Sequence, residues 1–254
     1  MAERWLSYFL VGTPRTGSSR LSEALTATGC LGHPEEYFWR LQEHHWASRF
    51  GMPPPDQSNY ERYPAAAVEA GTTPNGVFGA KLFWIHLHDL LRHSEHFREL
   101  GHLPGHLRFQ AIFGPSIRAV FVRRNCLRAA ISLWRAETTG VWSERGGDDP
   151  PPVPENLDVW RVTTLNADIH AAEIGWPHFL NSATIPYMTV HYDEIAQDLG
   201  GVAGQVAEFL GVDLPPRSGN ISPTLRRQAD QATERFIGQW TRVTGGCGIC
   251  EANG

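Results

Sequence analysis

Long apolar runs are missing from this chain of 254 residues. Because it contains no stretch of about 18 apolar residues, no transmembrane helix is expected. Residues 1–7 carry charges and lack the apolar core and cleavage site of a secretory signal peptide. Cysteine is scarce, with four residues, which is typical of proteins in a reducing compartment. We therefore expect a cytoplasmic protein with no membrane span.

An excess of positive charge is also missing. The 22 lysine and arginine residues are outnumbered by 27 acidic residues, which gives a net charge of −5. A general nucleic-acid binder needs a basic face, so nucleic acid is not an expected partner. A small anionic ligand remains compatible with this charge, because a few arginines and backbone amides suffice to bind it.

A metal-binding pattern is absent as well. The chain has 12 histidines, but neither the pair His44 and His45 nor the pair His86 and His88 has a convincing set of further ligands. The zinc-protease motif H-E-x-x-H does not occur. We expect no metal site.

Apolar segments of two lengths alternate along the chain and predict its fold. With 41% hydrophobic and 19% charged residues, the composition is that of a globular protein, which we expect to form a single domain over residues 1–254. The expected strands are residues 8–11, 77–82, 118–122 and 184–190, and the expected helices are residues 19–28, 126–138 and 202–210. Strands that alternate with helices predict an α/β fold with a central, mostly parallel sheet flanked by helices.

Three regions interrupt this pattern. Residues 41–75 and 143–155 are rich in proline, glycine or alanine, and both are expected to be surface excursions. The tail from residue 245 is expected to be poorly ordered. Its Cys247 and Cys250 have the spacing of a redox motif, but no preceding strand or second cysteine pair supports redox or zinc chemistry.

The first expected strand runs into a loop with the spacing of a phosphate-binding site. Gly12 and Gly17 are separated by four residues, and Ser18 and Ser19 begin the helix that follows. Such a loop turns backbone N–H groups inward, and the helix N-terminus adds a positive partial charge. The segment therefore predicts an anion-binding loop.

One position of this loop departs from the pattern of nucleotide triphosphatases. The lysine expected after the second glycine is replaced by Ser18, and a cation stands inside the loop instead, at Arg15. The sequence also has no convincing acidic strand end that would bind Mg²⁺. An enzyme that cleaves ATP or GTP is therefore disfavoured.

Five segments of the chain, in order, resemble the bacterial sulfotransferases typified by trehalose 2-sulfotransferase. They are YFLVGTPRTGSS (8–19), GHPEEYF (32–38), PNGVFGAKLFW (74–84), the segment from RRN to SLWRA (123–136) and RQAD (227–230). The resemblance implies a fold related to P-loop kinases, a three-layer sandwich. It also implies 3′-phosphoadenosine 5′-phosphosulfate (PAPS) as the sulfuryl donor, 3′,5′-ADP as the product and no metal.

The same resemblance implies where the donor binds. Arg15, Ser18, Ser19 and the loop amides are expected at the 5′-phosphosulfate, with Arg15 stabilising the charge of the leaving phosphate. Thr16 and Gly17 are expected to contribute through the backbone, and Pro14 is a further loop residue expected at the donor.

The 3′-phosphate is expected at a second place. Arg124 and Ser132, which lie at a strand end and in the next helix, match the family pair that binds it, and Arg123 is the adjacent alternative. Arg227 and Gln228 are expected in a segment that closes over the nucleotide.

For catalysis the resemblance points to Glu36 as the general base, which takes the proton of the acceptor hydroxyl. Glu35 is its neighbour and could be confused with it. Lys81 is expected at the transferring sulfonate or at the acceptor, with a solvated strand-end lysine as the equally weighted alternative.

The function expected from these residues is sulfuryl transfer to a hydroxyl of a sugar, a glycolipid or a natural product, by a protein that resembles enzymes forming homodimers. A P-loop nucleotide kinase or phosphotransferase is the first alternative, and Ser18 speaks against it. A non-catalytic nucleotide-binding protein is the second, and Glu36 speaks against it.

Overall fold

A four-stranded parallel sheet lies at the centre of the molecule. The computed structural model describes residues 6–143, 153–215 and 231–245. The strands are β1 (Leu6–Gly12), β2 (Val77–Phe83), β3 (Ile117–Arg123) and β4 (Tyr187–His191), in the order β2-β1-β3-β4. Every neighbouring pair is parallel. The expected α/β fold with a parallel sheet is confirmed.

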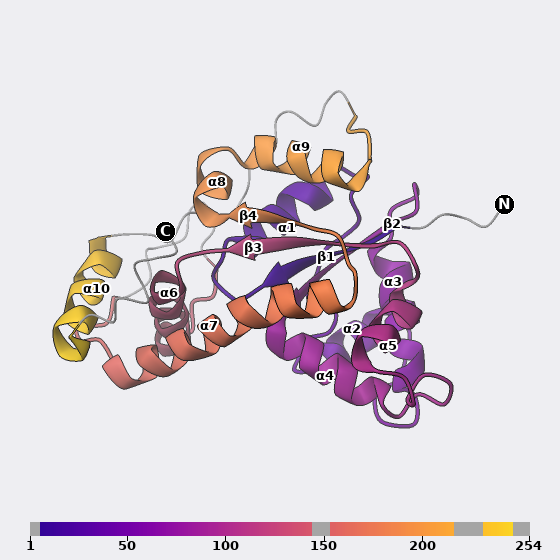
Figure 1. Cartoon of the computed structure of the whole chain (residues 1–254), viewed down its shortest axis with the longest axis horizontal. Helices are drawn as coiled ribbons and strands as arrows, with labels where there is room; N and C mark the ends of the chain where they lie inside the picture. The colour runs from indigo at the N-terminus through magenta and orange to yellow at the C-terminus, as the bar shows by residue number, and fades with distance from the viewer. Residues whose placement is uncertain (1–5, 144–152, 216–230, 246–254) are drawn as a thin grey trace.

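Helices cover both faces of this sheet (Figure 1). They are α1 (Ser18–Ala27), α2 (Glu43–Arg49), α3 (Tyr63–Gly71), α4 (Trp84–Ser94), α5 (Gly105–Phe113), α6 (Cys126–Thr139), α7 (Val159–Ser182), α8 (Tyr192–Gln197), α9 (Leu199–Leu210) and α10 (Gln231–Thr244), with a 3₁₀ turn η1 at Tyr60–Arg62. None of the helices in these described ranges combines the length and apolarity needed to cross a bilayer.

The alternation of side chains along β1 separates the two halves of the core. Tyr8 and Leu10 pack with the apolar residues of α1, α8 and α9 on one face. Phe9 and Val11 point to the opposite face, where the cores of α2 to α5 and α7 lie. Successive side chains of a strand point to opposite faces, so one apolar run serves two helical layers. The result is the expected three-layer sandwich.

Residues 41–75, expected to be a surface excursion, instead contribute helices and core side chains. This segment contains α2, η1 and α3, and Trp46, Tyr60 and Tyr63 are buried in the same apolar cluster as Phe9 and Val11. The hydroxyl of Tyr60 donates a hydrogen bond to the buried carboxylate of Glu43 at 2.7 Å. The prediction followed the high proline and glycine content of the segment and did not account for these buried aromatic residues. The other two regions expected to be irregular were residues 143–155 and the tail from residue 245. Residues 144–152 and 246–254, which include Cys247 and Cys250, lie outside the described residues.

The strand order brings the carboxyl ends of all four strands to one edge. Gly12 pairs with Phe83 of β2 and with Val122 of β3, and Arg123 pairs with His191 of β4. The chain leaves β1 toward β2 on one side and later returns to β3 on the other, so β1 is a topological switch point. Ligands of open parallel sheets bind at the carboxyl ends beside such a point.

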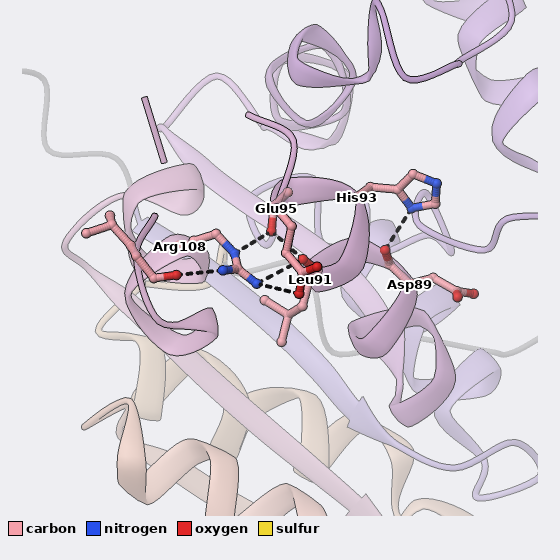
Figure 2. A network of polar contacts seen from close by, with 7 residues as sticks. Asp89, Leu91, His93, Glu95 and Arg108 are labelled. Atoms are coloured by element: carbon pink, nitrogen blue, oxygen red, sulfur yellow. Dashed lines mark hydrogen bonds and ion pairs between the residues drawn. The ribbon is translucent and has the colours of Figure 1, made fainter. Parts of the chain in front are cut away.

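A buried arginine holds the end of α4 against the loop that leads to α5 (Figure 2). The guanidinium of Arg108 donates to the carbonyl of Leu91 at 3.1 Å, to that of Leu103 at 2.5 Å and to the hydroxyl of Ser94 at 3.0 Å. It also reaches the exposed carboxylate of Glu95 at 3.4 Å. Carbonyls in the last turn of a helix lack helical partners, and Arg108 satisfies one of them.

Replacing Arg108 by methionine should therefore destabilise the fold while keeping most of the side-chain volume. We expect the free energy of unfolding to fall by about 2 kcal/mol, because the carbonyl of Leu103 loses the guanidinium donor and the carbonyl of Leu91 keeps only the hydroxyl of Ser94. Urea titration would measure it. The matched control is Arg92→Met, on the exposed face of the same helix, which should change stability by less than about 0.5 kcal/mol. Equal effects of the two substitutions would contradict this role of Arg108.

Candidate functional site

The predicted anion-binding loop begins where β1 ends and needs glycine at both of its ends. Gly12 has a φ of 153°, and a Cβ there would lie 2.5 Å from the carbonyl oxygen of Val122. Gly17 has a φ of 85°, and a Cβ there would lie 3.0 Å from the ring of Tyr192. Arg15, between them, is also left-handed, with a φ of 71°. Only a residue without a side chain fits at the first position.

The interior of the loop is arranged through its own backbone. The hydroxyl of Thr16, fully buried, donates to the carbonyl of Thr13 at 3.0 Å, so Thr16 offers its backbone to a ligand. No side chain caps α1, because its N-cap residue is Gly17. The Oγ1 of Thr13 is buried and has no hydrogen-bond partner within the described residues. An uncapped helix start beside an orphaned polar atom suits an anion.

Arg15 and Ser132 are in direct contact, although the sequence assigned them to opposite ends of the donor. The Nε of Arg15 donates to the hydroxyl of Ser132 on α6 at 3.1 Å. One guanidinium nitrogen donates to the carbonyl of Trp142, just after α6. The loop and α6 therefore face one another across this arginine.

The two neighbouring arginines at the end of β3 point in different directions. Arg124 donates to the carbonyl of Arg15 at 2.8 Å, and its guanidinium carbon lies 4.0 Å from the centre of the Tyr192 ring. Arg123 instead forms an ion pair with Glu173 of α7 at 2.6 Å. The pKa of Glu173 is raised above its ordinary value, because the effect of burial exceeds the lowering by the hydrogen bond from Arg123. Arg124 is thus the arginine at the loop, and Arg123 is engaged by α7.

Lys81 connects Glu36 to the loop. It is the single lysine of the sequence, it is 5% exposed, and it lies inside β2. Its ammonium group contacts Oε1 of Glu36 at 2.8 Å and donates to the hydroxyl of Ser19 at 3.0 Å. A buried ammonium ion requires such partners. The expectation of a solvated strand-end lysine is wrong.

Backbone pairing places Glu36 beside Lys81. Glu35 forms an isolated parallel bridge with Ala80, and the N–H of Lys81 donates to the carbonyl of Glu35 at 2.9 Å. The hydroxyl of Ser22 on α1 donates to the carbonyl of Pro34 at 2.6 Å. The segment is thereby attached to β2 and to the helix that follows the loop.

A neutral histidine lies near this ion pair, at the start of α4. The N–H of Phe83 donates to Nδ1 of His86 at 3.4 Å, which places the ring proton on Nε2. Burial lowers the pKa of His86 to about 4, despite the opposing effects of Glu36 and Asp89, and the charge of Lys81 lowers it further. The imidazole is therefore uncharged near neutral pH.

Most of the expected site residues converge on this edge of the sheet. Pro14 and Ser18 lie in the loop with the residues described above, Pro14 half-buried and Ser18 buried. Arg227 and Gln228 lie outside the described residues. In the part of the chain that the structure describes, no group of three or more histidine, cysteine, aspartate or glutamate side chains has the arrangement of a metal site.

Two contributors to the site were missed from the sequence. Tyr192 directly follows β4 and supports both Arg124 and Gly17. The indole N–H of Trp176 in α7 donates to the carbonyl of Gly12 at 2.9 Å. Tyr192 lies just after a predicted strand, at the edge where the site was expected, so its position could have indicated it. Trp176 lies in α7, a helix that the sequence did not predict.

The chain resembles known sulfotransferases over nearly its whole length. The sequence profile of the family described as Stf0 sulphotransferase matches residues 7–242. A relative named trehalose 2-sulfotransferase from Mycolicibacterium smegmatis is 26% identical over 267 residues, which cover 95% of this chain and 97% of that protein. A protein of the same name from Mycobacterium tuberculosis is 26% identical over 256 residues, which cover 92% of this chain and 93% of the relative.

The solved structure of a sulfotransferase from Alicyclobacillus acidocaldarius has a TM-score of 0.47 and 12% identity over 97% of this chain and 99% of that one. A likeness of this degree adds nothing to the family assignment.

The buried state of His86 predicts a pH dependence of stability. Its pKa of about 4 in the folded protein is below the ordinary 6.5, so its contribution is complete above about pH 6.5 and is lost as the pH falls through 4. Between pH 7.5 and 4, the free energy of unfolding of the wild type should fall by about 3 kcal/mol more than that of His86→Gln.

Urea titrations at several pH values would measure this difference. The control is His88→Gln, on the exposed side of the same helix, which should keep the wild-type pH dependence. The same dependence in His86→Gln as in the wild type would refute the assignment.

Proposed function

The chain belongs to the Stf0 sulfotransferase family, and we propose that it moves a sulfuryl group from PAPS to a hydroxyl of a carbohydrate or another small metabolite. The observation that carries the proposal is the chain of contacts from Glu36 through Lys81 to Ser19. It joins a partly exposed carboxylate to the first turn of the helix behind an anion-binding loop. An acceptor base and a donor site therefore share one buried cation.

The loop side of the site binds the donor in this proposal. The backbone N–H groups of the loop, with Ser18 and Ser19, hold the 5′-phosphosulfate at the uncapped start of α1. Arg124 and Ser132 hold the 3′-phosphate, and both already contact Arg15. The absence of a lysine at position 18 suits a donor whose transferred group carries less charge than a γ-phosphate.

Sulfuryl transfer makes demands similar to those of phosphoryl transfer, namely in-line attack and stabilisation of charge on the leaving oxygen. PAPS supplies the sulfuryl group and departs as 3′,5′-ADP. Arg15, which is part of the loop and is fixed by Ser132 and the carbonyl of Trp142, stabilises the leaving phosphate.

The acceptor side is built around Glu36. Lys81 contacts Oε1, and Oε2 has no hydrogen-bond partner within the described residues. Oε2 is the atom that takes the proton of the acceptor hydroxyl. An ammonium group has three donors, and Glu36 and Ser19 use two of them. The third N–H of Lys81 is left for the transferring group.

The names of the two relatives make trehalose a candidate acceptor for this chain. Other sugars, a glycolipid and a natural product are further members of the same class. We keep the cytoplasm as the location, on the scarcity of cysteine. For its assembly we propose a homodimer.

Donor recognition can be tested by calorimetry. We expect 3′,5′-ADP to bind without Mg²⁺ and more tightly than ATP with Mg²⁺, because Ser18 replaces the lysine of triphosphate sites. Arg124→Ala should weaken 3′,5′-ADP about 10- to 100-fold, the effect of one charged hydrogen-bonding partner. Arg128→Ala is the matched control, since Arg128 pairs with Glu234 on the exposed surface. Tighter binding of ATP with Mg²⁺ would favour a phosphotransferase instead.

The base is tested by Glu36→Gln, which keeps the shape of the side chain and removes its basicity. With labelled PAPS and an accepted carbohydrate, kcat should fall about 100-fold or more, while the affinity for 3′,5′-ADP should stay unchanged. Glu35→Gln is the control at the adjacent position. Near wild-type turnover in Glu36→Gln would exclude this base. Wild-type protein that binds 3′,5′-ADP but sulfates no acceptor would favour a non-catalytic nucleotide binder.

A further inference from the structure

Three backbone carbonyl groups of the loop accept hydrogen bonds from side chains, namely those of Gly12, Thr13 and Arg15. Their donors, in the same order, are Trp176 at 2.9 Å, Thr16 at 3.0 Å and Arg124 at 2.8 Å. A carbonyl oxygen carries a partial negative charge, so one that pointed toward a bound anion would repel it. The three bonds therefore hold these oxygens on donors of the protein itself.

Binding a carbonyl also fixes the direction of the next backbone donor. A peptide bond is planar and trans, so the N–H of a residue points away from the carbonyl of the residue before it. Because the carbonyl of Gly12 is bound to Trp176, the N–H of Thr13 points away from Trp176. In the same way, the N–H of Thr16 points away from Arg124. Each of these two bonds thus sets the orientation of one donor of the loop.

The donor on α7 is fixed by its packing. Trp176 is fully buried, and its ring meets that of Trp84 edge to face, with ring centres 5.2 Å apart. Gly175 makes room for this contact, because a Cβ there would lie 2.3 Å from the ring of Trp84. Three residues before Trp176, Glu173 pairs with Arg123 at the end of β3. One turn of α7 is therefore in contact with the carboxyl ends of both β1 and β3.

We propose that Trp176 is a positioning residue for the sulfuryl donor. Its indole N–H holds the carbonyl of Gly12 on α7, so that the loop meets the 5′-phosphosulfate with N–H groups instead of a carbonyl oxygen. The inference rests on the proposed binding of PAPS, and Trp176 acts through the backbone of Gly12 and Thr13 without touching the ligand. Loss of the indole N–H should therefore impair recognition of the 5′-phosphate. The 3′-phosphate, proposed at Arg124 and Ser132, should be recognised as before.

The test measures the binding of two nucleotides by calorimetry, 3′,5′-ADP and adenosine 3′-phosphate, which lacks the 5′-phosphate. Trp176→Phe keeps a buried ring and removes the N–H. We expect it to weaken 3′,5′-ADP about 10-fold and adenosine 3′-phosphate less than about twofold. The matched control is Trp240→Phe, because the buried indole N–H of Trp240 donates to the hydroxyl of Thr163 at 3.0 Å, in a cluster without loop residues. The control should change neither affinity by more than about twofold.

Equal weakening of both nucleotides in Trp176→Phe, or no weakening of 3′,5′-ADP, would overturn the positioning role alone. Wild type that binds 3′,5′-ADP no more tightly than adenosine 3′-phosphate would refute the proposed 5′-phosphosulfate site, and the positioning role with it. Thermal unfolding verifies that the variants are folded. Should Trp176→Phe not fold, NMR of the wild type with isotope-labelled tryptophan replaces it. Because coupling is reciprocal, saturating 3′,5′-ADP should slow solvent exchange of the Trp176 indole N–H more than saturating adenosine 3′-phosphate does, and equal exchange would overturn the role.

Discussion

The ammonium group of Lys81 holds together two parts of the site that come from distant parts of the chain. A charge buried this deeply is costly unless it is paired and hydrogen-bonded, and the structure gives Lys81 the carboxylate of Glu36 and the hydroxyl of Ser19. All other side-chain cations of the sequence, histidine aside, are arginines. A lysine suits this position because its ammonium is a compact charge with three donors that are free to rotate, whereas the rigid fork of arginine matches flat phosphate groups. Arginines accordingly lie on the loop side, and the lysine lies between Glu36 and the loop.

The parallel sheet is what allows these groups to meet. Parallel strands end at the same edge, so the loop after β1, Arg124 after β3 and Tyr192 after β4 share one end of the molecule. The helices then support this edge from both faces. Trp176 of α7 binds the carbonyl of Gly12 from one face, and the ring of Tyr192 at the start of α8 lies under Gly17 near the other. The two glycines that bound the loop are thereby each in contact with a side chain from a flanking helix.

Much of the fold could be predicted because its signals are local. Each of the four expected strands overlaps an observed one. Helix α6 begins at Cys126, as expected, and ends one residue beyond its predicted end. The prediction of a surface excursion at residues 41–75 was wrong. The aromatic rings of this segment are buried against other elements, and they follow no periodic pattern in the sequence. The long helix α7 was not predicted at all, and with it the contact of Trp176 was missed. Arg123 and Arg124 were adjacent alternatives, and tertiary contacts separate them: Arg123 pairs with Glu173 of α7, whereas Arg124 contacts the loop and Tyr192.

The anion-binding loop is the part that the sequence by itself determined. Its glycine spacing, its lack of a lysine at position 18 and the strand and helix around it are properties of neighbouring residues, and local backbone conformation follows from them. The meeting of Glu36 and Lys81 was decided by the tertiary structure. It depends on the bridge between Glu35 and Ala80. The register of such a pairing is set by burial and packing across the whole sheet, since a shift by one residue turns each side chain to the opposite face.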